Sequence, residues 1–285
     1  MDCETKLIKA YAKINLLLDV IMKRPDGFHE LEGIMQSISL YDEVLVSRAD
    51  GITVECDTPL PYMNTCRKAA ELYLGGSGCG AHIRVNKHIP SEAGLGGASA
   101  DGAAVLKGLN ALYRGTPLYR DEDELMRIGV RVGADVPFCL AGGCAVARGV
   151  GEVLSPIRGM ELPLLIVRGS RGVSTGRLFA SLGVGSERRS RLPEGALSAA
   201  IRAIEGCDAA ALAAALGNAL RPAAEEVAPE IAEYASMMMD SGALGASMTG
   251  SGAAVFGIFA DAAAAEKAAE SFRGCDFVCC CKTLV

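Results

Sequence analysis

The strongest constraint on this chain is the stretch from Pro90 to Leu112, in which glycines directly precede a helical pattern. Three of the four residues from Gly94 to Gly97 are glycine. Apolar residues then recur with the spacing of one helical face, at Val105, Leu106, Leu109 and Leu112. Glycine lets the backbone approach a ligand closely, and the first turn of a helix offers unpaired N–H groups and a positive dipole end. The stretch therefore predicts a phosphate-binding turn.

Two familiar phosphate-binding turns do not fit this stretch. A P-loop requires Lys followed by Ser or Thr after its glycines, and the chain has no such pair here. The dinucleotide fingerprint requires glycine at its first, third and sixth places, and the sixth place counted from Gly94 is Ser99. On local sequence alone, a tight strand-to-helix turn without a ligand stays open.

Composition excludes several classes of protein. The 285 residues are half apolar, which allows a large buried core, and the net charge of −6 argues against a nucleic-acid partner. The eleven cysteines show no zinc-site spacing and end in the run Cys279–Cys281. We therefore expect them to be small buried apolar residues of a protein in a reducing compartment. No apolar run is long enough to span a membrane. We expect a cytoplasmic protein without a membrane or nucleic-acid partner.

The order of the expected elements favours an α+β class, because strands and helices mix without regular βαβ alternation. We expect two domains, residues 1–156 and 157–285, with the best linker candidate at Pro156 to Pro163. The segment from Leu7 to Met22 predicts a strand pair or one long strand, with Lys13 and Asn15 on one face.

Further along the chain, Asp121 and Glu124 form a capping-box pattern that predicts a helix from Glu122 to Val132. Two separate strands are expected over Gly33 to Leu40 and Val44 to Arg48, and a glycine-rich strand region over residues 139–153.

Three separated segments share one order and spacing: Ala12 to Leu16, Gly94 to Ser99, and Thr249 to Gly252. This arrangement resembles the three motifs of the GHMP kinases, the galactose, homoserine, mevalonate and phosphomevalonate kinase superfamily. Residues 24–44 and 133–154 extend the resemblance. It is strongest to members that act on the cytidylyl-linked methylerythritol diphosphate of non-mevalonate isoprenoid biosynthesis.

The resemblance implies a two-lobed fold, with a ribosomal-protein-like N-terminal lobe, a ferredoxin-like C-terminal lobe and an active site in the cleft between them. It implies transfer of the ATP γ-phosphoryl group to the C2 hydroxyl of the methylerythritol unit, with ATP and Mg²⁺ as cofactors. It implies a small-molecule substrate and a monomer or weak homodimer. No residue is named as a direct protein ligand of the metal.

Roles for individual residues also follow from the resemblance. Asp135 matches the catalytic aspartate that accepts the hydroxyl proton, and Lys13 matches its lysine partner. Read alone, Asp135 could instead cap a helix and Lys13 could lie at a strand edge. The ATP-binding positions are expected at Lys87, Pro90, Gly94, Leu95, Gly96, Gly97, Ala98 and Ser99, and Ala100 stands where relatives often have a second serine.

The substrate end is expected to use Phe28 and Phe179 as two rings that stack on cytosine, with His29 providing polar contacts. The full expected set is Asn15, Phe28, His29, Thr175 and Phe179, together with the C-terminal glycine motif Thr249, Gly250, Ser251 and Gly252. Phe179 could instead be an ordinary core residue.

Two rival functions stay open. A mevalonate or homoserine kinase would keep the chemistry, but its substrate has no base for Phe28 and Phe179 to stack on. A GHMP-like sensor without catalysis would have no need for both Lys13 and Asp135.

Overall fold

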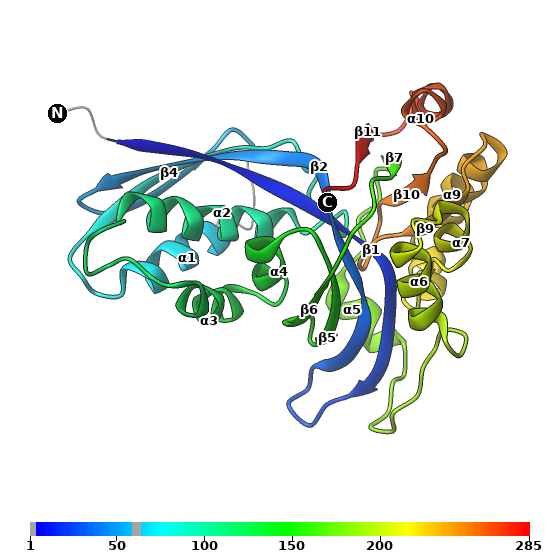
Figure 1. The fold of residues 1–285 in the computed structure, drawn as a ribbon, viewed down its shortest axis with the longest axis horizontal. Coiled ribbons are helices and arrows are strands. Elements are labelled where there is room, and N and C mark those ends of the chain that lie inside the picture. Colours follow the sequence, from blue (N-terminus) through cyan, green and yellow to red (C-terminus); the bar gives the residue numbers. More distant parts are fainter. Residues whose placement is uncertain (1–3, 59–63) are drawn as a thin grey trace. The chain divides into compact units, whose positions relative to one another are not determined.

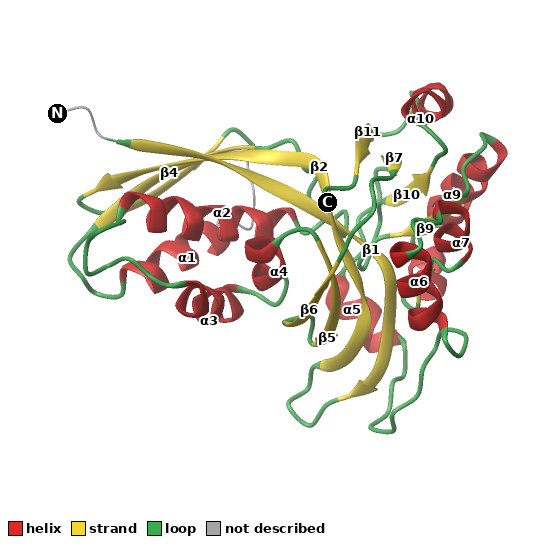
Figure 2. Cartoon of the chain, in the orientation of Figure 1, coloured by secondary structure: helices red, strands yellow, loops and turns green. Residues whose placement is uncertain are grey.

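A computed structural model of the chain describes residues 4–58 and 64–285, without the side chain of Asn64. The chain divides into two compact units (Figures 1 and 2). The first unit contains Met1–Ala12, Leu40–Ser91 and Gly96–Gly142, and the second contains Lys13–Ser39, Glu92–Leu95 and Gly143–Val285. The long strands β1 (Thr5–Lys23) and β2 (His29–Ala49) contribute residues to both.

The first unit packs helices against strands. The end of β2 pairs antiparallel with β4 (Gly80–Asn86), which pairs parallel with β3 (Ile52–Cys56). One face of these strands is covered by α1 (Asn64–Leu74) and α2 (Gly97–Leu112) (Figure 1). Helices α3 (Glu122–Val132) and α4 (Val136–Ala141) pack against α1 and α2. The core between these layers is apolar and includes Val44, Val46, Tyr73, Leu106 and Leu109.

The second unit contains an antiparallel sheet in the order β11-β7-β10-β9. Its strands are β7 (Pro163–Arg168), β9 (Gly245–Met248), β10 (Val255–Ile258) and β11 (Phe277–Lys282). Other strands of this unit are β5 (Cys144–Gly149), which pairs with β2, then β6 (Val153–Ile157) beside β5, and β8 (Gly217–Asn218), which pairs with β1.

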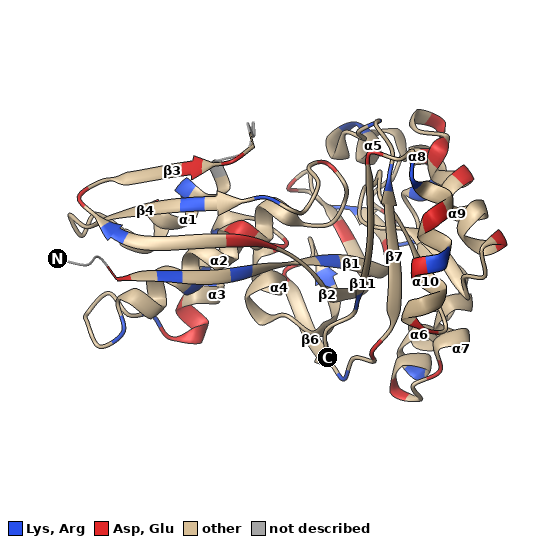
Figure 3. Ribbon diagram, turned by 90° about the horizontal axis from the view of Figure 1, so that it is seen from above, with Lys and Arg blue, Asp and Glu red and all other residues tan. Residues whose placement is uncertain are grey.

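The second unit also contains short helices, several of them rich in alanine. They are α5 (Thr175–Ser181), α6 (Ala196–Glu205), α7 (Ala209–Ala214), α8 (Arg221–Val227), α9 (Glu230–Asp240) and α10 (Ala262–Ala269), followed by the 3₁₀ turn Glu270–Phe272. Helices α9 and α10 contact the strands directly. The charged residues of α8 and α9 are mostly acidic (Figure 3). Across the described residues, none of the helices has the length and hydropathy needed to cross a bilayer.

Most of the predicted elements are confirmed, and the α+β class with them. Helix α3 has the predicted bounds, and its capping box is present: the Glu124 N–H donates to Asp121 Oδ1 at 2.8 Å and the Asp121 N–H donates to Glu124 Oε2 at 3.4 Å. The side chains of Lys13 and Asn15 are on one face of β1, as alternation predicts, because Lys13 Nζ donates to Asn15 Oδ1 at 2.7 Å. The domain boundary at residue 156 stays a prediction.

Two predictions about local structure are wrong. The expected strand region over residues 139–153 begins instead with helix α4, because Pro137 occupies its first turn and Gly142, at φ +73°, ends it. The two strands expected between Gly33 and Arg48 form the single strand β2, which continues through Asp42 because the Asp42 carboxylate is bonded within the fold.

Candidate functional site

In the second unit, three of the sequence motifs meet at the hydroxyl of Thr249. Thr249 Oγ1 accepts a hydrogen bond from the backbone N–H of Asn15 at 3.1 Å and donates one to the carbonyl oxygen of Gly94 at 3.2 Å. The backbone N–H of Lys13 donates to the carbonyl oxygen of Leu95 at 2.9 Å. Thr249 is fully buried, so these bonds are shielded from water. One side chain thus joins residues 15, 94 and 249 of the chain.

Gly94 is the position that this junction constrains most. Its φ of +73° is in the left-handed region, and a Cβ added there would lie 2.1 Å from the carbonyl oxygen of Thr249. The two backbone segments stay close beyond this point, since the N–H groups of Ala253 and Ala254 donate to the carbonyl oxygens of Glu92 and Ala93 at 3.3 and 3.2 Å. The glycine therefore permits two backbones to lie in direct contact.

Asn218 is a site residue that no sequence motif indicated. Its Nδ2 donates to the carbonyl oxygens of Met248 and Gly250 at 2.9 and 2.8 Å, and its Oδ1 accepts from the N–H of Leu220 at 2.9 Å. Asn218 thus fixes the C-terminal glycine motif through the carbonyl oxygens of Met248 and Gly250. Its sequence signal is weak, because it is one polar residue within an apolar stretch.

Lys13 is buried in β1, with 4% of its surface exposed, so it is not a strand-edge lysine. Its ammonium donates to Asn15 Oδ1. Asn15 is buried as well, at 2% exposure. Because water does not screen a buried ammonium group, its electrostatic field is stronger than that of an exposed one.

In the first unit, Asp135 lies at the N-cap position of α4 and is half-buried. Its side chain makes no capping bond to the helix, so the alternative role of a helix cap does not describe it. Ser99, in the first turn of α2, lies near the same turn, because a Cβ added at Gly133 would be 3.9 Å from Ser99 Oγ. The unit thus brings Ser99 close to the segment that carries Asp135.

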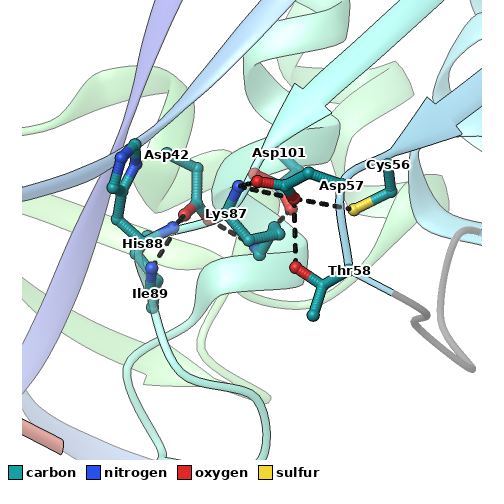
Figure 4. A network of polar contacts seen from close by, with 8 residues as sticks. All are labelled: Asp42, Cys56, Asp57, Thr58, Lys87, His88, Ile89 and Asp101. Carbon is teal, nitrogen blue, oxygen red and sulfur yellow. Dashed lines mark hydrogen bonds and ion pairs between the residues drawn. The ribbon is translucent and has the colours of Figure 1, made fainter.

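Behind the first turn of α2 is a buried group of charges (Figure 4). Lys87 Nζ is paired with Asp42 Oδ2 and with Asp101 Oδ2, the latter at 2.7 Å. Asp42 Oδ1 accepts from the backbone N–H groups of His88 and Ile89. Oδ1 of Asp101 is buried without a hydrogen-bond partner.

At the substrate end, His29 and Phe179 stack with ring centroids 5.0 Å apart. Phe28 is 64% exposed. Burial, with the positive charges of Lys23 and Arg191, lowers the pKa of His29, so its ring is neutral at pH 7 and has one donor and one acceptor nitrogen. The Oγ1 of Thr175 bonds to the Oγ of Ser251 at 2.7 Å.

Comparison with known proteins identifies the family. The model of the GHMP kinases N terminal domain matches residues 64–143, and that of the GHMP kinases C terminal region matches residues 200–275. A 4-diphosphocytidyl-2-C-methyl-D-erythritol kinase of Acetivibrio thermocellus is 44% identical over 97% of this chain and 98% of its own length. One from Pelotomaculum thermopropionicum is 43% identical over 94% and 93%.

The chain belongs to the GHMP kinase family.

Solved structures agree with this assignment. A crystal structure of 4-(cytidine 5'-diphospho)-2C-methyl-D-erythritol kinase superposes with a TM-score of 0.81 at 33% identity, covering 98% of this chain and 99% of the other. The mevalonate kinase of L. major, solved with R-mevalonate, reaches a TM-score of 0.72 at 21% identity over 99% and 96%. The second likeness shows the shared fold alone.

Membership in the GHMP kinases implies the use of ATP, and the donor groups suit it. The first turn of α2 has backbone N–H groups that no carbonyl of the helix can accept from, which is the property that binds phosphate. Among the described residues, no three His, Cys, Asp or Glu side chains gather as a metal site. Magnesium at kinase sites commonly keeps water and phosphate oxygens as ligands, so ATP itself can provide most of them.

The Thr249 junction predicts the effect of removing its hydroxyl. Thr249→Val keeps the shape but leaves the Asn15 N–H and the Gly94 carbonyl buried without this partner, at about 1–3 kcal/mol for each group. We expect the free energy of unfolding in urea to fall by about 3 kcal/mol. The control Thr53→Val removes an exposed hydroxyl, which bonds to His82, and should change stability by less than about 0.5 kcal/mol. Equal losses in both variants would contradict the role of Thr249.

The buried charges predict a pH dependence. Burial raises the pKa of Asp101 to about 7, while Lys87 opposes the rise and Asp42 adds to it. Because its pKa in the folded protein is above the ordinary value, Asp101 stabilises the fold fully below that ordinary value. This stabilisation is lost as the pH rises through 7. The variant Asp101→Asn cannot ionise at this position. Its free energy of unfolding should therefore rise, relative to that of the wild type, by up to about 1.4 kcal/mol per pH unit between pH 5 and 7. Denaturant titrations at pH 5, 6, 7 and 8 measure this difference, and a constant difference would contradict the raised pKa.

Proposed function

We propose that this protein transfers the γ-phosphoryl group of ATP to the C2 hydroxyl of 4-diphosphocytidyl-2-C-methyl-D-erythritol. The observation that carries the proposal is full-length similarity of about 40% or more to several kinases named for this substrate. The mevalonate and homoserine kinases with the same fold are only 21% and 20% identical. The proposed location is the cytoplasm, and the monomer or weak homodimer stays a prediction.

Phosphoryl transfer needs a positioned hydroxyl and neutralised phosphate charge, and little other chemistry. We assign Asp135 the proton of the C2 hydroxyl, so that the hydroxyl oxygen attacks the γ-phosphorus while the bond to the β-phosphate oxygen breaks and ADP leaves. We assign Lys13 the stabilisation of the negative charge that develops on the transferred group. The burial of the Lys13 ammonium supports this role, because its field is strong where water is excluded.

The triphosphate is proposed to bind along the glycine turn and the first turn of α2. The positions assigned to it are Gly94 to Ser99, with Lys87 and Pro90 at its border. Backbone N–H groups are the proposed donors, and Ser99 is the hydroxyl proposed near the phosphates. Mg²⁺, when bound with ATP, would neutralise phosphate charge; Ser99 is the side chain that we propose nearest to it.

The nucleoside end of the substrate is proposed to bind at Phe28, His29 and Phe179. Phe28 is exposed and so available to stack on a base, which typically contributes about 1–3 kcal/mol. His29 rests on Phe179 in this structure, and its neutral ring can both donate to and accept from cytosine. Asn15 and Thr175 are proposed to contact the methylerythritol and cytidine side.

The substrate assignment predicts a selective reaction. With purified protein and Mg-ATP, coupled detection of ADP should show turnover with the cytidylyl substrate and only background with mevalonate or homoserine, because those alcohols carry no base to stack. A ³¹P spectrum of the product should show a new phosphomonoester. Equal ADP release with mevalonate, or none with the cytidylyl substrate, would refute the assignment.

The role of Asp135 predicts a selective loss of rate. Asp135→Asn keeps the shape of the side chain but cannot take up the proton, so kcat should fall by about 10² or more while ATP binding measured by calorimetry is retained. The control Asp123→Asn changes an exposed aspartate of α3 and should leave kcat within about twofold of the wild type. A normal kcat in Asp135→Asn would exclude Asp135 as the base.

A further inference from the structure

Lys87 joins three segments of the first unit through one ammonium group. Asp42 comes from the middle of β2, Lys87 follows the end of β4, and Asp101 is in the second turn of α2. Lys87 Nζ pairs with both carboxylates, and the side chains of all three are at most 8% exposed. Figure 4 shows the ammonium between the two carboxylates. We call these three residues the Lys87 clamp.

The clamp also fixes the backbone that follows β4. The N–H of Lys87 donates to Asp57 Oδ1 at 3.1 Å, and the N–H groups of His88 and Ile89 donate to Asp42 Oδ1. Successive backbone groups are thus bonded to carboxylates from β2 and from the segment after β3. This part of the chain has little freedom to move independently of the strands.

The clamp is in contact with the first residue of α2. A Cβ added at Gly97 would lie 3.1 Å from Ile89 Cγ2 and 3.4 Å from Lys87 Nζ. Asp101 ties the same helix one turn later, at 2.7 Å from the ammonium. The first turn of α2 is therefore packed against Ile89 and Lys87 and anchored by an ion pair.

The ammonium of Lys87 is already engaged by two carboxylates, which neutralise its charge. One ammonium facing two carboxyl groups adds no net positive charge for a phosphate to bind. What the clamp can provide is geometry, because anion binding by backbone N–H groups depends on holding those groups in place.

We infer that Lys87 is a positioning residue for ATP: held by Asp42 and Asp101, it fixes the first turn of α2 so that the backbone N–H groups of that turn face the triphosphate. The inference rests on the proposed ATP-binding role of this turn. It assigns Asp42 and Asp101 to the same function, although a carboxyl group cannot attract a phosphate directly.

The direction in which one substitution changes the affinity for ATP separates positioning from direct attraction. Asp42→Asn keeps an oxygen for the N–H groups of His88 and Ile89 but replaces the oxygen facing Lys87 with an amide donor. If Lys87 acted on ATP through its charge, removing a nearby negative charge would strengthen ATP binding. If the clamp positions the turn, the same change weakens ATP binding.

We expect Asp42→Asn and Lys87→Met each to raise the Kd and the KM for ATP by about tenfold, the scale on which misplacing a binding group weakens a site, while kcat and the KM for the alcohol stay within about twofold. Amide hydrogen exchange of residues 97–101 should become faster in both. Asp101→Asn provides the same test of sign if either variant does not fold.

Two matched controls report on general damage. Lys107→Met removes a lysine of the same helix whose Nζ donates to the carbonyl oxygen of Cys139, and Asp19→Asn changes a buried aspartate that binds Ser190 and Arg191. Both should leave the Kd for ATP unchanged. Tighter or unchanged ATP binding in Asp42→Asn, with normal binding by the wild type, would overturn the inference alone. Absence of ATP binding by the wild type would overturn the proposed function and this inference with it.

Discussion

The hydroxyl of Thr249 is the contact on which the arrangement of the second unit depends. It accepts from Asn15 and donates to Gly94, so a residue near the end of the chain fixes two segments that precede it by 234 and 155 residues. Such distant contacts are costly to form, because the intervening chain loses entropy when they close. Asn218 offsets part of that cost by holding the carbonyl oxygens on either side of Thr249.

The glycine at position 94 and the hydrogen bond made by Thr249 depend on each other. The left-handed backbone at Gly94 and the 2.1 Å that a Cβ would leave to the Thr249 carbonyl exclude a side chain there. The short approach in turn allows the Thr249 hydroxyl to reach the Gly94 carbonyl. The glycine of a nucleotide-binding motif is therefore required here for packing within the protein, in addition to any closeness to a ligand.

Local patterns in the sequence were sufficient for elements whose determinants are close in sequence. The capping box of α3, the shared face of Lys13 and Asn15, and the helix after the glycine turn all depend on residues within a few positions. Asp42 and Asn218 could not be predicted in this way, because their partners are distant and an isolated polar residue has no period. Helix α4 was missed because its single Pro137 and its end at Gly142 were outweighed by the surrounding glycines.

The polar residues around Thr249 and those around Lys87 both have to be buried away from water, and they meet this requirement in different ways. Around Thr249, uncharged groups pair with backbone atoms, so burial costs little once each bond is made. Around Lys87, two carboxylates compete for one ammonium, and the cost appears as the raised pKa of Asp101 and the unpartnered Asp101 Oδ1. A protein selected for stability alone would do better with apolar residues at such a place. The persistence of that cost beside the first turn of α2 is what connects the clamp to function, since a fixed turn is useful only if something binds to it.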